Sequence, residues 1–297
     1  MVRYEILAAA SAVTILAGCR NDIDFDACGQ IDAEQVTVSA EASGRILSLN
    51  VREGDVLNAG QMVGAVDSVQ TSLQIRELEQ RRDGARSRLI DIDRQQAPQK
   101  DQLANLENDF RRYSSLLANN AATQKQVDDL RSQIDILKSQ MAAQKQTWER
   151  NNSSVRSEIS TYEIQIAEKR DQLAKCRICP PVAGTVLTKY ANEGESVTVG
   201  KPLFKLADLT ETYVRAYFTT SQLSTLKLGD EMKVIPDDGS ASPKEYTGRV
   251  IWISSQAEFT PKDIQTRDER AELVYAVKVA VPNDGSLRLG MYAYVRK

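Results

Sequence analysis

The chain has 297 residues, of which 41% are apolar and 27% are charged. This length is typical of two or three structural units, and the balance favours an elongated molecule over one large globule. The 38 basic and 41 acidic residues give a formal net charge of −3, which argues against nucleic-acid binding. There is no histidine, so imidazole bases, Ser-His-Asp triads and histidine metal sites are excluded. We therefore expect no catalytic residue, no cofactor and no metal.

The first 19 residues have the pattern of a secretory signal. A positive charge at Arg3 precedes an apolar run over 6–17 and the tetrad Leu-Ala-Gly-Cys, which ends at Cys19. The run would rise only about 18 Å as a helix, which is short for a membrane span. The tetrad resembles the bacterial lipobox, which implies a lipoprotein signal peptide over 1–18 and a lipid anchor on Cys19. An ordinary signal peptide that contains a cysteine is the alternative.

Two short segments, 36–68 and 178–209, match each other at a fixed offset. Gly44 and the Glu-Gly turn at Gly54 correspond to Gly184 and Gly194, four positions that we interpret as structural turns. Short β-rich runs between such turns predict half of a small β-sandwich in each copy. Neither half has enough apolar residues to fold alone. The two halves must therefore close on each other, and the chain between them must leave and return to nearly the same place.

Residues 69–177 predict an α-helical coiled-coil hairpin. Only one glycine and one proline, Gly84 and Pro98, lie between 69 and 179, although the chain holds 15 glycines and 8 prolines. Mainly apolar residues recur at steps of three and four over 78–117 and again over 127–176, which is the spacing of a coiled-coil seam. About 47 residues in each arm would give a rod of roughly 70 Å.

The turn and one joint of this hairpin are also indicated. Asn119-Asn120 is expected to make the turn, and Thr123 with Gln126 predicts a capping box that starts the return helix. Pro98 removes a helical hydrogen bond where glutamines replace apolar seam residues, so we expect a kink or joint there. The polar run 151–154 is a similar weak point in the return arm, and the sequence leaves open whether the two pair.

The whole arrangement resembles the periplasmic adaptor proteins (HlyD-like membrane fusion proteins) of tripartite exporters. The resemblance implies a mixed α and β, multidomain, elongated fold: a lipoyl-like β-sandwich split by a long α-helical coiled-coil hairpin, plus a C-terminal β-barrel domain over 210–297. Residues 19–35 are then a linker that could hold the first barrel strand. The runs 213–217, 221–229 and 259–275 look like the barrel of adaptors that serve ABC-type exporters. The chain ends soon after Gly290-Met291, so we expect no fourth, membrane-proximal domain, which favours the same branch.

The resemblance also implies partners and location. The protein would join an inner-membrane ABC-type permease or ATPase to a TolC-type outer-membrane channel, as a ring of several protomers. It would be held in the periplasm by the lipid on Cys19, on the inner membrane, with no nucleic-acid partner. A structural coiled-coil scaffold lipoprotein of the periplasm is the alternative function. A lipoyl-type carrier subunit is disfavoured, because no lysine precedes Lys100.

The predicted binding to a TolC-type channel rests on a motif at the predicted hairpin tip. Adaptors of this kind have an arginine, a leucine four residues later and a serine seven residues after that. Arg112, Leu116 and Thr123 have this spacing, with threonine in place of serine. Arg112 and Leu116 share a helix face outside the seam, which leaves them available to a partner. The alternative is that Leu116 shields the turn, Arg112 is a solvated charge and Thr123 only caps the helix.

Cys176 and Cys179 have the C-x-x-C spacing of redox and metal motifs. The chain has no second C-x-x-C pair, which a zinc site would need, and this pair does not lie between a strand and a helix, as a redox motif would. We therefore expect either buried free thiols or a local Cys176–Cys179 disulfide, and no catalysis. Cys28 is expected to lie far beyond disulfide reach of this pair.

Overall fold

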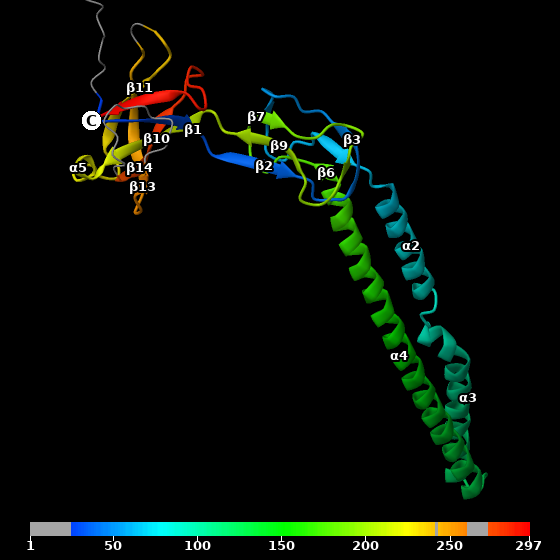
Figure 1. The fold of residues 1–297 in the computed structure, drawn as a ribbon. Coiled ribbons are helices and arrows are strands. Elements are labelled where there is room, and N and C mark those ends of the chain that lie inside the picture. Colours follow the sequence, from blue (N-terminus) through cyan, green and yellow to red (C-terminus); the bar gives the residue numbers. More distant parts are fainter. Residues whose placement is uncertain (1–24, 241–242, 260–272) are drawn as a thin grey trace, which may run out of the picture.

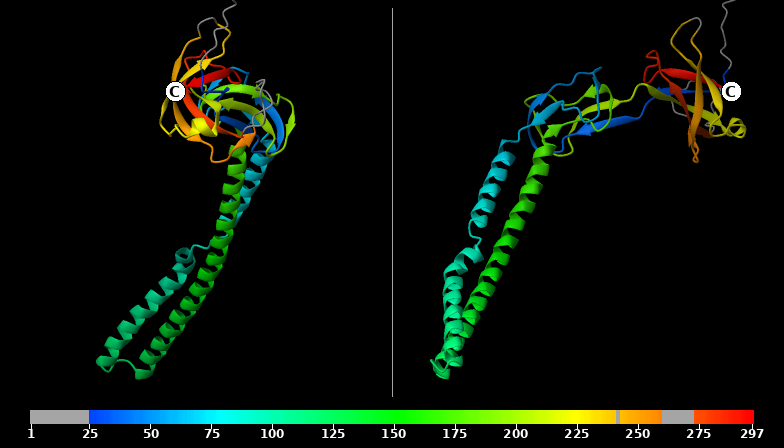
Figure 2. Two further views of the ribbon diagram at one scale, coloured as in Figure 1. Left: turned by 60° about the vertical axis from the view of Figure 1, so that its left-hand side comes forward. Right: turned by 180° about the vertical axis from the view of Figure 1, so that it is seen from behind.

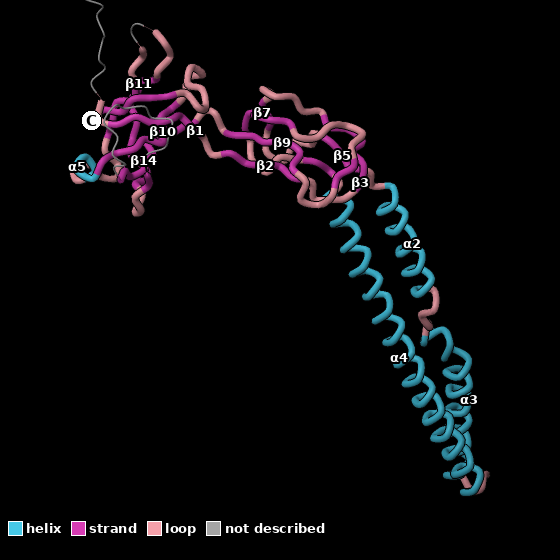
Figure 3. Tube along the Cα trace, in the orientation of Figure 1, coloured by secondary structure: helices cyan, strands magenta, loops and turns pink. Residues whose placement is uncertain are grey.

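A computed structural model describes residues 25–240, 243–259 and 273–297. These residues form a bent, elongated molecule in which a β-barrel, a β-sandwich and a helical hairpin follow one another (Figure 1). Figure 3 shows that the strands are confined to the first two parts and the long helices to the third. The predicted mixed, multidomain fold class is confirmed. Within the described residues, no helix has both the length and the apolar character that a membrane span needs.

The sandwich consists of two four-stranded sheets, ordered β2-β9-β7-β4 and β6-β5-β3-β8. The first sheet contains β2 (Gln35–Ser39), β9 (Pro202–Ala207), β7 (Gly184–Lys189) and β4 (Val56–Leu57). The second contains β6 (Arg177–Ile178), β5 (Gly64–Val66), β3 (Gly44–Leu49) and β8 (Ser196–Val197). Each sheet thus takes two strands from each repeat, and exchanging the two repeats converts one sheet order into the other.

Reciprocal hydrogen bonds join the two repeats. The Gly54 amide donates to the Val186 carbonyl at 2.9 Å, and the equivalent Gly194 amide donates to the Ile46 carbonyl, also at 2.9 Å. The core between the sheets is shared in the same way, since Val66 and Leu206 are both almost fully buried in one cluster. Each edge strand of a sheet pairs with a strand of the other repeat, and the core contains residues of both repeats. Neither half can therefore form a closed sandwich by itself.

The four repeat glycines have two different roles. Gly54 and Gly194 lie in turns with φ of 92° and 87°, where a side chain is strained. The interpretation of Gly44 and Gly184 as turn residues is wrong, because they are the first residues of β3 and β7. A Cβ on Gly184 would lie 2.7 Å from the Ala207 carbonyl oxygen, and one on Gly44 would lie 2.9 Å from a Val66 methyl group. Close packing at the start of the strand therefore requires glycine at both positions.

We predict that Gly54→Ala and Gly194→Ala each lower the free energy of unfolding by about 1 kcal/mol, because a Cβ is strained at positive φ. Neither Cβ would meet another atom within 4 Å, so the two costs should be alike. Gly84→Ala is the control, since Gly84 lies in a helix with open space around it and alanine should stabilise there. Chemical denaturation monitored by circular dichroism measures all three. A loss at only one of the two turns would contradict the pseudo-symmetric pairing.

The hairpin has a broken outgoing arm and a continuous return arm. The outgoing arm is α2 (Val69–Arg86) followed by α3 (Ile92–Ala118), and the return arm is the 52-residue α4 (Gln124–Lys175). The expected kink or joint at Pro98 is wrong in position, because Pro98 lies inside α3 and the break spans 87–91, as both views of Figure 2 show. Arg94, whose carbonyl loses its partner to Pro98, is exposed, so water can satisfy that carbonyl.

Local side chains stabilise the break. The Ser87 hydroxyl donates to the Gly84 carbonyl at 2.8 Å, and the Asp91 carboxylate accepts from the Arg94 amide at the start of α3. One helix therefore ends and the next begins with its own cap, which makes the interruption a built joint of the arm.

Asn152 of α4 holds this joint from the opposite arm. Its side-chain oxygen accepts from the Ile90 amide at 2.9 Å, and its side-chain amide donates to the Ile90 carbonyl at 2.8 Å. Asn152 is only 4% exposed, so both bonds are shielded from water. One and two turns farther along α4, Val155 and Ile159 pack on Ala85. The polar run 151–154 thus does not interrupt α4. Its buried residue, Asn152, makes the hydrogen bonds that the backbone of Ile90 cannot make within a helix.

We predict that Asn152→Ala lowers the free energy of unfolding by about 1–3 kcal/mol, because it leaves the partly buried amide and carbonyl of Ile90 without their side-chain partner. Asn151→Ala, at an exposed neighbour, is the matched control and should change little. Hydrogen exchange of the amides over 88–92 should accelerate in the first variant alone. Equal exchange in both would mean that Asn152 does not hold the joint.

The barrel is closed by six strands in the order β10-β1-β15-β11-β12-β14, with β14 pairing back to β10. They are β10 (Glu211–Thr219), β1 (Ala27–Asp32), β15 (Tyr292–Arg296), β11 (Glu231–Pro236), β12 (Tyr246–Ile253) and β14 (Leu273–Pro282); β13 (Glu258–Phe259) extends β14. β1 precedes the sandwich in the chain, so two connections join barrel and sandwich. The run 221–229 contains the end of a short helix, α5 (Thr220–Leu223), from which turns lead to Gly229. Most of the run 259–275 lies outside the described residues.

Candidate functional site at the hairpin tip

The hairpin turn is built by its two asparagines, as predicted. Asn119 ends α3, and Asn120 adopts φ of 58°, a left-handed conformation that asparagine tolerates better than most residues. The Ala121 amide reaches back to the Leu116 carbonyl at 2.8 Å and the Asn120 amide to the Leu117 carbonyl at 2.9 Å. This pair of bonds satisfies the last carbonyls of the helix in a Schellman motif.

Thr123 starts the return helix through the predicted capping box, which is confirmed. Its hydroxyl accepts from the Gln126 amide at 3.4 Å, and the Gln126 side chain accepts from the Thr123 amide at 2.9 Å. These two bonds satisfy backbone donors that the first turn of a helix otherwise leaves free. The Thr123 hydroxyl is therefore engaged within the tip.

Arg112 and Leu116 lie one turn apart on the outer face of α3. The Arg112 side chain is 65% exposed and pairs with Asp109 at 2.9 Å, and Leu116 is 39% exposed. Tyr113 and Leu117, which the seam was expected to contain, are half-buried. The tip therefore presents a guanidinium with spare donors beside an apolar side chain. Such a pair can meet a carbonyl or carboxylate and bury apolar area on the same partner.

Ion pairs along the shaft connect the two arms. Lys138 of α4 pairs with Glu107 of α3 at 2.7 Å, and Arg170 of α4 pairs with Glu79 of α2 at 2.7 Å. These pairs are exposed, so each contributes little to stability. One pair lies on each side of the joint, so both α2 and α3 contact α4 through charged side chains.

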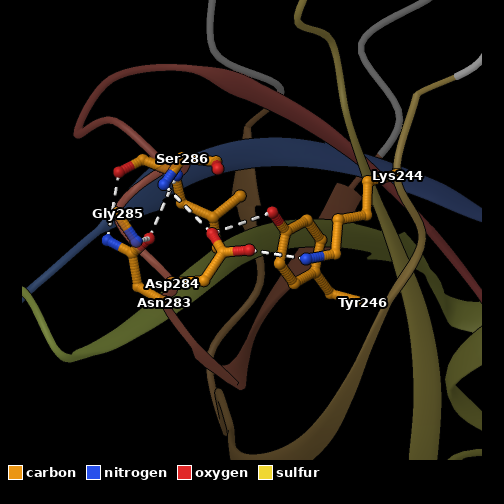
Figure 4. Close-up of polar contacts among 7 residues, drawn as sticks. Lys244, Tyr246, Asn283, Asp284, Gly285 and Ser286 are labelled. Atoms are coloured by element: carbon orange, nitrogen blue, oxygen red, sulfur yellow. Dashed lines mark hydrogen bonds and ion pairs between the residues drawn. The ribbon is translucent and has the colours of Figure 1, made fainter.

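A polar cluster fixes the junction of barrel and sandwich, at the turn between β14 and β15 (Figure 4). Asn283 donates from its side-chain amide to the carbonyl of Leu209, within the connection that leaves the sandwich, at 2.9 Å. Asp284 accepts from Lys244 and from the Tyr246 hydroxyl. The Lys244 ammonium holds the pKa of Asp284 well below its usual range, and the pKa of Lys244 is raised in return. Both groups are thus charged at neutral pH.

Sequence reasoning did not identify this junction cluster. Asn283-Asp284-Gly285 is a strong turn signal, but a turn signal says nothing of the partners that a tertiary fold brings to it.

Burial lowers the reactivity of two cysteines, Cys28 and Cys176. Cys28, Cys176 and Cys179 are free thiols, and Cys176 is buried. Burial raises the pKa of Cys28 and of Cys176, which keeps both protonated at neutral pH. Of the two alternatives for the C-x-x-C pair, the structure has the free thiols. Over 25–240, 243–259 and 273–297, no group of three or more Cys, Asp or Glu side chains is placed to hold a metal ion. Cys19 lies outside the described residues.

Comparison with known proteins gives one family match. Residues 34–209, which comprise the sandwich and the hairpin, match the model of the RND MFP barrel-sandwich hybrid domain. A "UPF0194 membrane protein" of Yersinia pseudotuberculosis is 28% identical over 326 residues, covering 100% of this chain and 99% of the relative. The UPF0194 membrane protein YbhG of Salmonella arizonae is 27% identical, covering 98% and 95%.

Solved structures show the same fold. The crystal structure of MacA from Actinobacillus actinomycetemcomitans aligns with a TM-score of 0.59 at 19% identity, covering 91% of this chain and 76% of that one. The membrane fusion protein Spr0693 from Streptococcus pneumoniae aligns with a TM-score of 0.52 at 18% identity, covering 91% and 96%.

We predict that Thr123→Ala destabilises the first turn of α4 by about 1 kcal/mol, because the helix loses its side-chain cap. Thr123→Ser keeps the hydroxyl and should behave like the parent chain. Hydrogen exchange of the amides over 124–127 is the appropriate measurement, because global unfolding is insensitive to fraying at the tip. Unchanged exchange in Thr123→Ala would show that the cap does not determine local stability.

Proposed function

The chain belongs to the membrane fusion protein family of periplasmic adaptors, and we propose that it links an inner-membrane, ABC-type transporter to a TolC-type outer-membrane duct. The observation that carries this proposal is the exposed pair Arg112 and Leu116 at the free end of the hairpin. Neither side chain is needed by the seam or by the turn, so both are available for a partner.

The shape of the molecule supports a bridging role. The 52 residues of α4 rise about 78 Å, and the sandwich lies at one end of this rod while the tip lies at the other (Figure 1). The barrel continues on the far side of the sandwich. A protein of this form can contact one partner through its barrel end and another through its tip without enclosing any substrate between its own domains.

The ABC branch and the membrane anchor are further parts of the proposal. The trailing segment 210–297 resembles the barrel of adaptors for ABC-type exporters, and the lipobox-like tetrad supports a lipid on Cys19. We propose that this lipid holds the barrel end at the inner membrane, in the periplasm. Several protomers then form a ring, so that the hairpin tips present a circle of Arg112 and Leu116 to the duct.

The tip chemistry suggests how docking is achieved. Asp109 occupies one Nη atom of Arg112, and the other guanidinium donors remain for a carbonyl or carboxylate of the duct. Leu116 would lose its water on contact, and an apolar group that becomes fully buried at the centre of an interface contributes most to affinity.

We predict that the double variant Arg112→Asp, Leu116→Ser abolishes crosslinking to the outer-membrane duct and lowers export, with nearly unchanged helicity and melting temperature. The charge reversal brings a carboxylate three residues from Asp109, which costs only about 0.2–0.5 kcal/mol on an exposed helix. The readouts are in-cell crosslinking and export, measured at equal protein abundance.

The neighbouring variant Arg111→Asp and the distant Ile136→Ser form the matched control. Arg111 is exposed and adjacent, and Ile136 is an exposed apolar residue of the shaft, 57% accessible. This control should dock and export normally. Full activity of the Arg112→Asp, Leu116→Ser variant would contradict docking through the tip and would favour the scaffold lipoprotein.

A further inference from the structure

Large apolar side chains gather at one end of the barrel. Five of them are between 42% and 68% exposed: Phe25, Leu228, Ile251, Trp252 and Leu273. In the described part of the barrel, the other large apolar side chain with comparable exposure is Tyr292, at the start of β15. Single exposed apolar residues are common on soluble proteins, but a group of this size at one place marks a contact surface.

Strand directions place these five residues at the same end. β1 runs from Ala27 toward the sandwich, so the end at which it begins is the outer end of the barrel, the end far from the sandwich. Antiparallel pairing of β1 with β15, β15 with β11, β11 with β12, and β12 with β14 then fixes every other strand. By this rule β15 and β12 end at the outer end, whereas β11 and β14 begin there. Figure 1 shows α5 and the C-terminus at this end.

The five residues are spread around the outer end. Phe25 precedes β1, Leu228 leads into β11, Ile251 and Trp252 belong to the end of β12, and Leu273 starts β14. We call these five residues the outer rim. The loop that holds Leu228 is tied to β12, because the Gly229 amide donates to the Val250 carbonyl at 2.8 Å. A rim that draws on four strand ends is suited to an extended, nearly flat partner that approaches the barrel end-on.

The chain toward the N-terminus leaves the barrel at this same end. The Asp26 amide donates to the Val295 carbonyl at 3.0 Å, and the Asp26 carboxylate accepts from the Lys297 amide at 2.8 Å. The Asp26 carbonyl accepts from the Gln222 side chain. Three hydrogen bonds therefore fix the exit point within the outer end.

The distance to the proposed anchor is short. Cys19 precedes Asp26 by seven residues, which span at most about 24 Å when fully extended. If Cys19 carries acyl chains, as the proposed function holds, a bilayer lies within that distance of the outer rim. An uncleaved apolar run over 6–17 would place a bilayer on the same side.

We propose that the outer rim docks on the surface of a phospholipid bilayer, with Trp252 in the interfacial region. Tryptophan is enriched at membrane–water interfaces because its indole is apolar over most of its surface and carries one polar donor. In the described part of this end, two ion pairs lie beside the rim, Lys297 with Asp230 at 2.9 Å and Arg249 with Glu231 at 3.7 Å. The five rim side chains are themselves uncharged, so the contact that they make is apolar. This inference rests on the proposed lipid anchor for the approach of the bilayer, although the rim itself is independent of acylation.

The two tryptophans of the chain provide the test. Trp148 lies in α4 and Trp252 in the rim, so Trp148→Phe leaves the rim reporter and Trp252→Phe leaves the hairpin reporter. Each full-length protein is isolated from membranes with its native N-terminus and reconstituted in phosphatidylcholine vesicles that contain brominated phosphatidylcholine. Trp252 fluorescence should fall at least roughly twofold, because the interfacial depth is within reach of a bromine quencher. Trp148 fluorescence should stay constant.

A rim variant separates contact from mere proximity. Leu228→Ser, Ile251→Ser and Leu273→Ser together should remove most of the quenching of Trp252 while the protein stays anchored. Val56→Ser, Ile136→Ser and Ile164→Ser, at exposed apolar positions of the sandwich and hairpin, should leave the quenching unchanged. Melting temperature should be unaltered in both, because all six side chains are exposed.

Three results would overturn the proposal: no quenching of Trp252 in vesicle-bound protein, quenching that survives the rim variant, or no vesicle binding at all. An apolar environment of Trp252 without bromine quenching would mean that protein covers the rim, either another segment of this chain or the transporter. Mass spectrometry of the same preparations reports acylation of Cys19, and export is assayed separately. An unacylated, export-inactive protein whose Trp252 is still quenched would disprove the proposed function and leave the rim contact standing.

Discussion

The structure depends on the pairing of two half-sandwiches that lie more than a hundred residues apart in the chain. The Gly54 and Gly194 amides make equivalent bonds across the pseudo-twofold, and each sheet combines strands of both repeats. Such long-range pairing is entropically costly to close unless the intervening chain is ordered. The hairpin supplies that order, since it returns the chain to the sandwich, where the Val66 amide donates to the Cys176 carbonyl at 2.8 Å. The sandwich and the hairpin therefore stabilise each other, and neither is an independent insertion.

The hairpin itself has almost no interior, and this explains its buried polar residues. A two-helix rod buries only one stripe of side chains on each helix, so apolar burial stabilises each turn of the rod only slightly. Where the outgoing arm breaks, its free backbone groups would be exposed to an apolar seam, and Asn152 satisfies both of them. Gln96 similarly donates to the Met141 carbonyl at 2.9 Å. These directional bonds fix the register of the two arms relative to each other, whereas apolar side chains can pack in several registers.

Much of the architecture follows from local signals, and the differences arise where tertiary contacts decide. The internal repeat, the scarcity of Gly and Pro over 69–179 and the Thr123 capping box are local, and they were sufficient to predict the sandwich, the hairpin and the start of α4. The predicted position of the joint was wrong because Pro98 is tolerated in an exposed helical turn of α3. The break at 87–91 is instead stabilised by Asn152, which lies 62 residues from its partner Ile90 in the chain. Gly184 requires glycine because of a close strand approach, which no turn signal reveals. The exposure of Arg112 and Leu116 could be predicted because they lie one turn apart on one helix, but the outer rim depends on strand direction and register around a closed barrel.

The two exposed surfaces of the molecule differ in a way that fits their positions. The tip offers two side chains on a narrow helical end, and the seam beside it is already filled, so it can engage a small and specific complementary site. The outer rim offers several apolar residues distributed over strand ends. The proposed roles match this difference, since specific recognition is proposed for the tip and broad, non-directional contact for the rim. Between them lie the Asn152 joint and the Asn283–Asp284 junction, whose hydrogen bonds connect backbone segments that apolar packing alone would not orient.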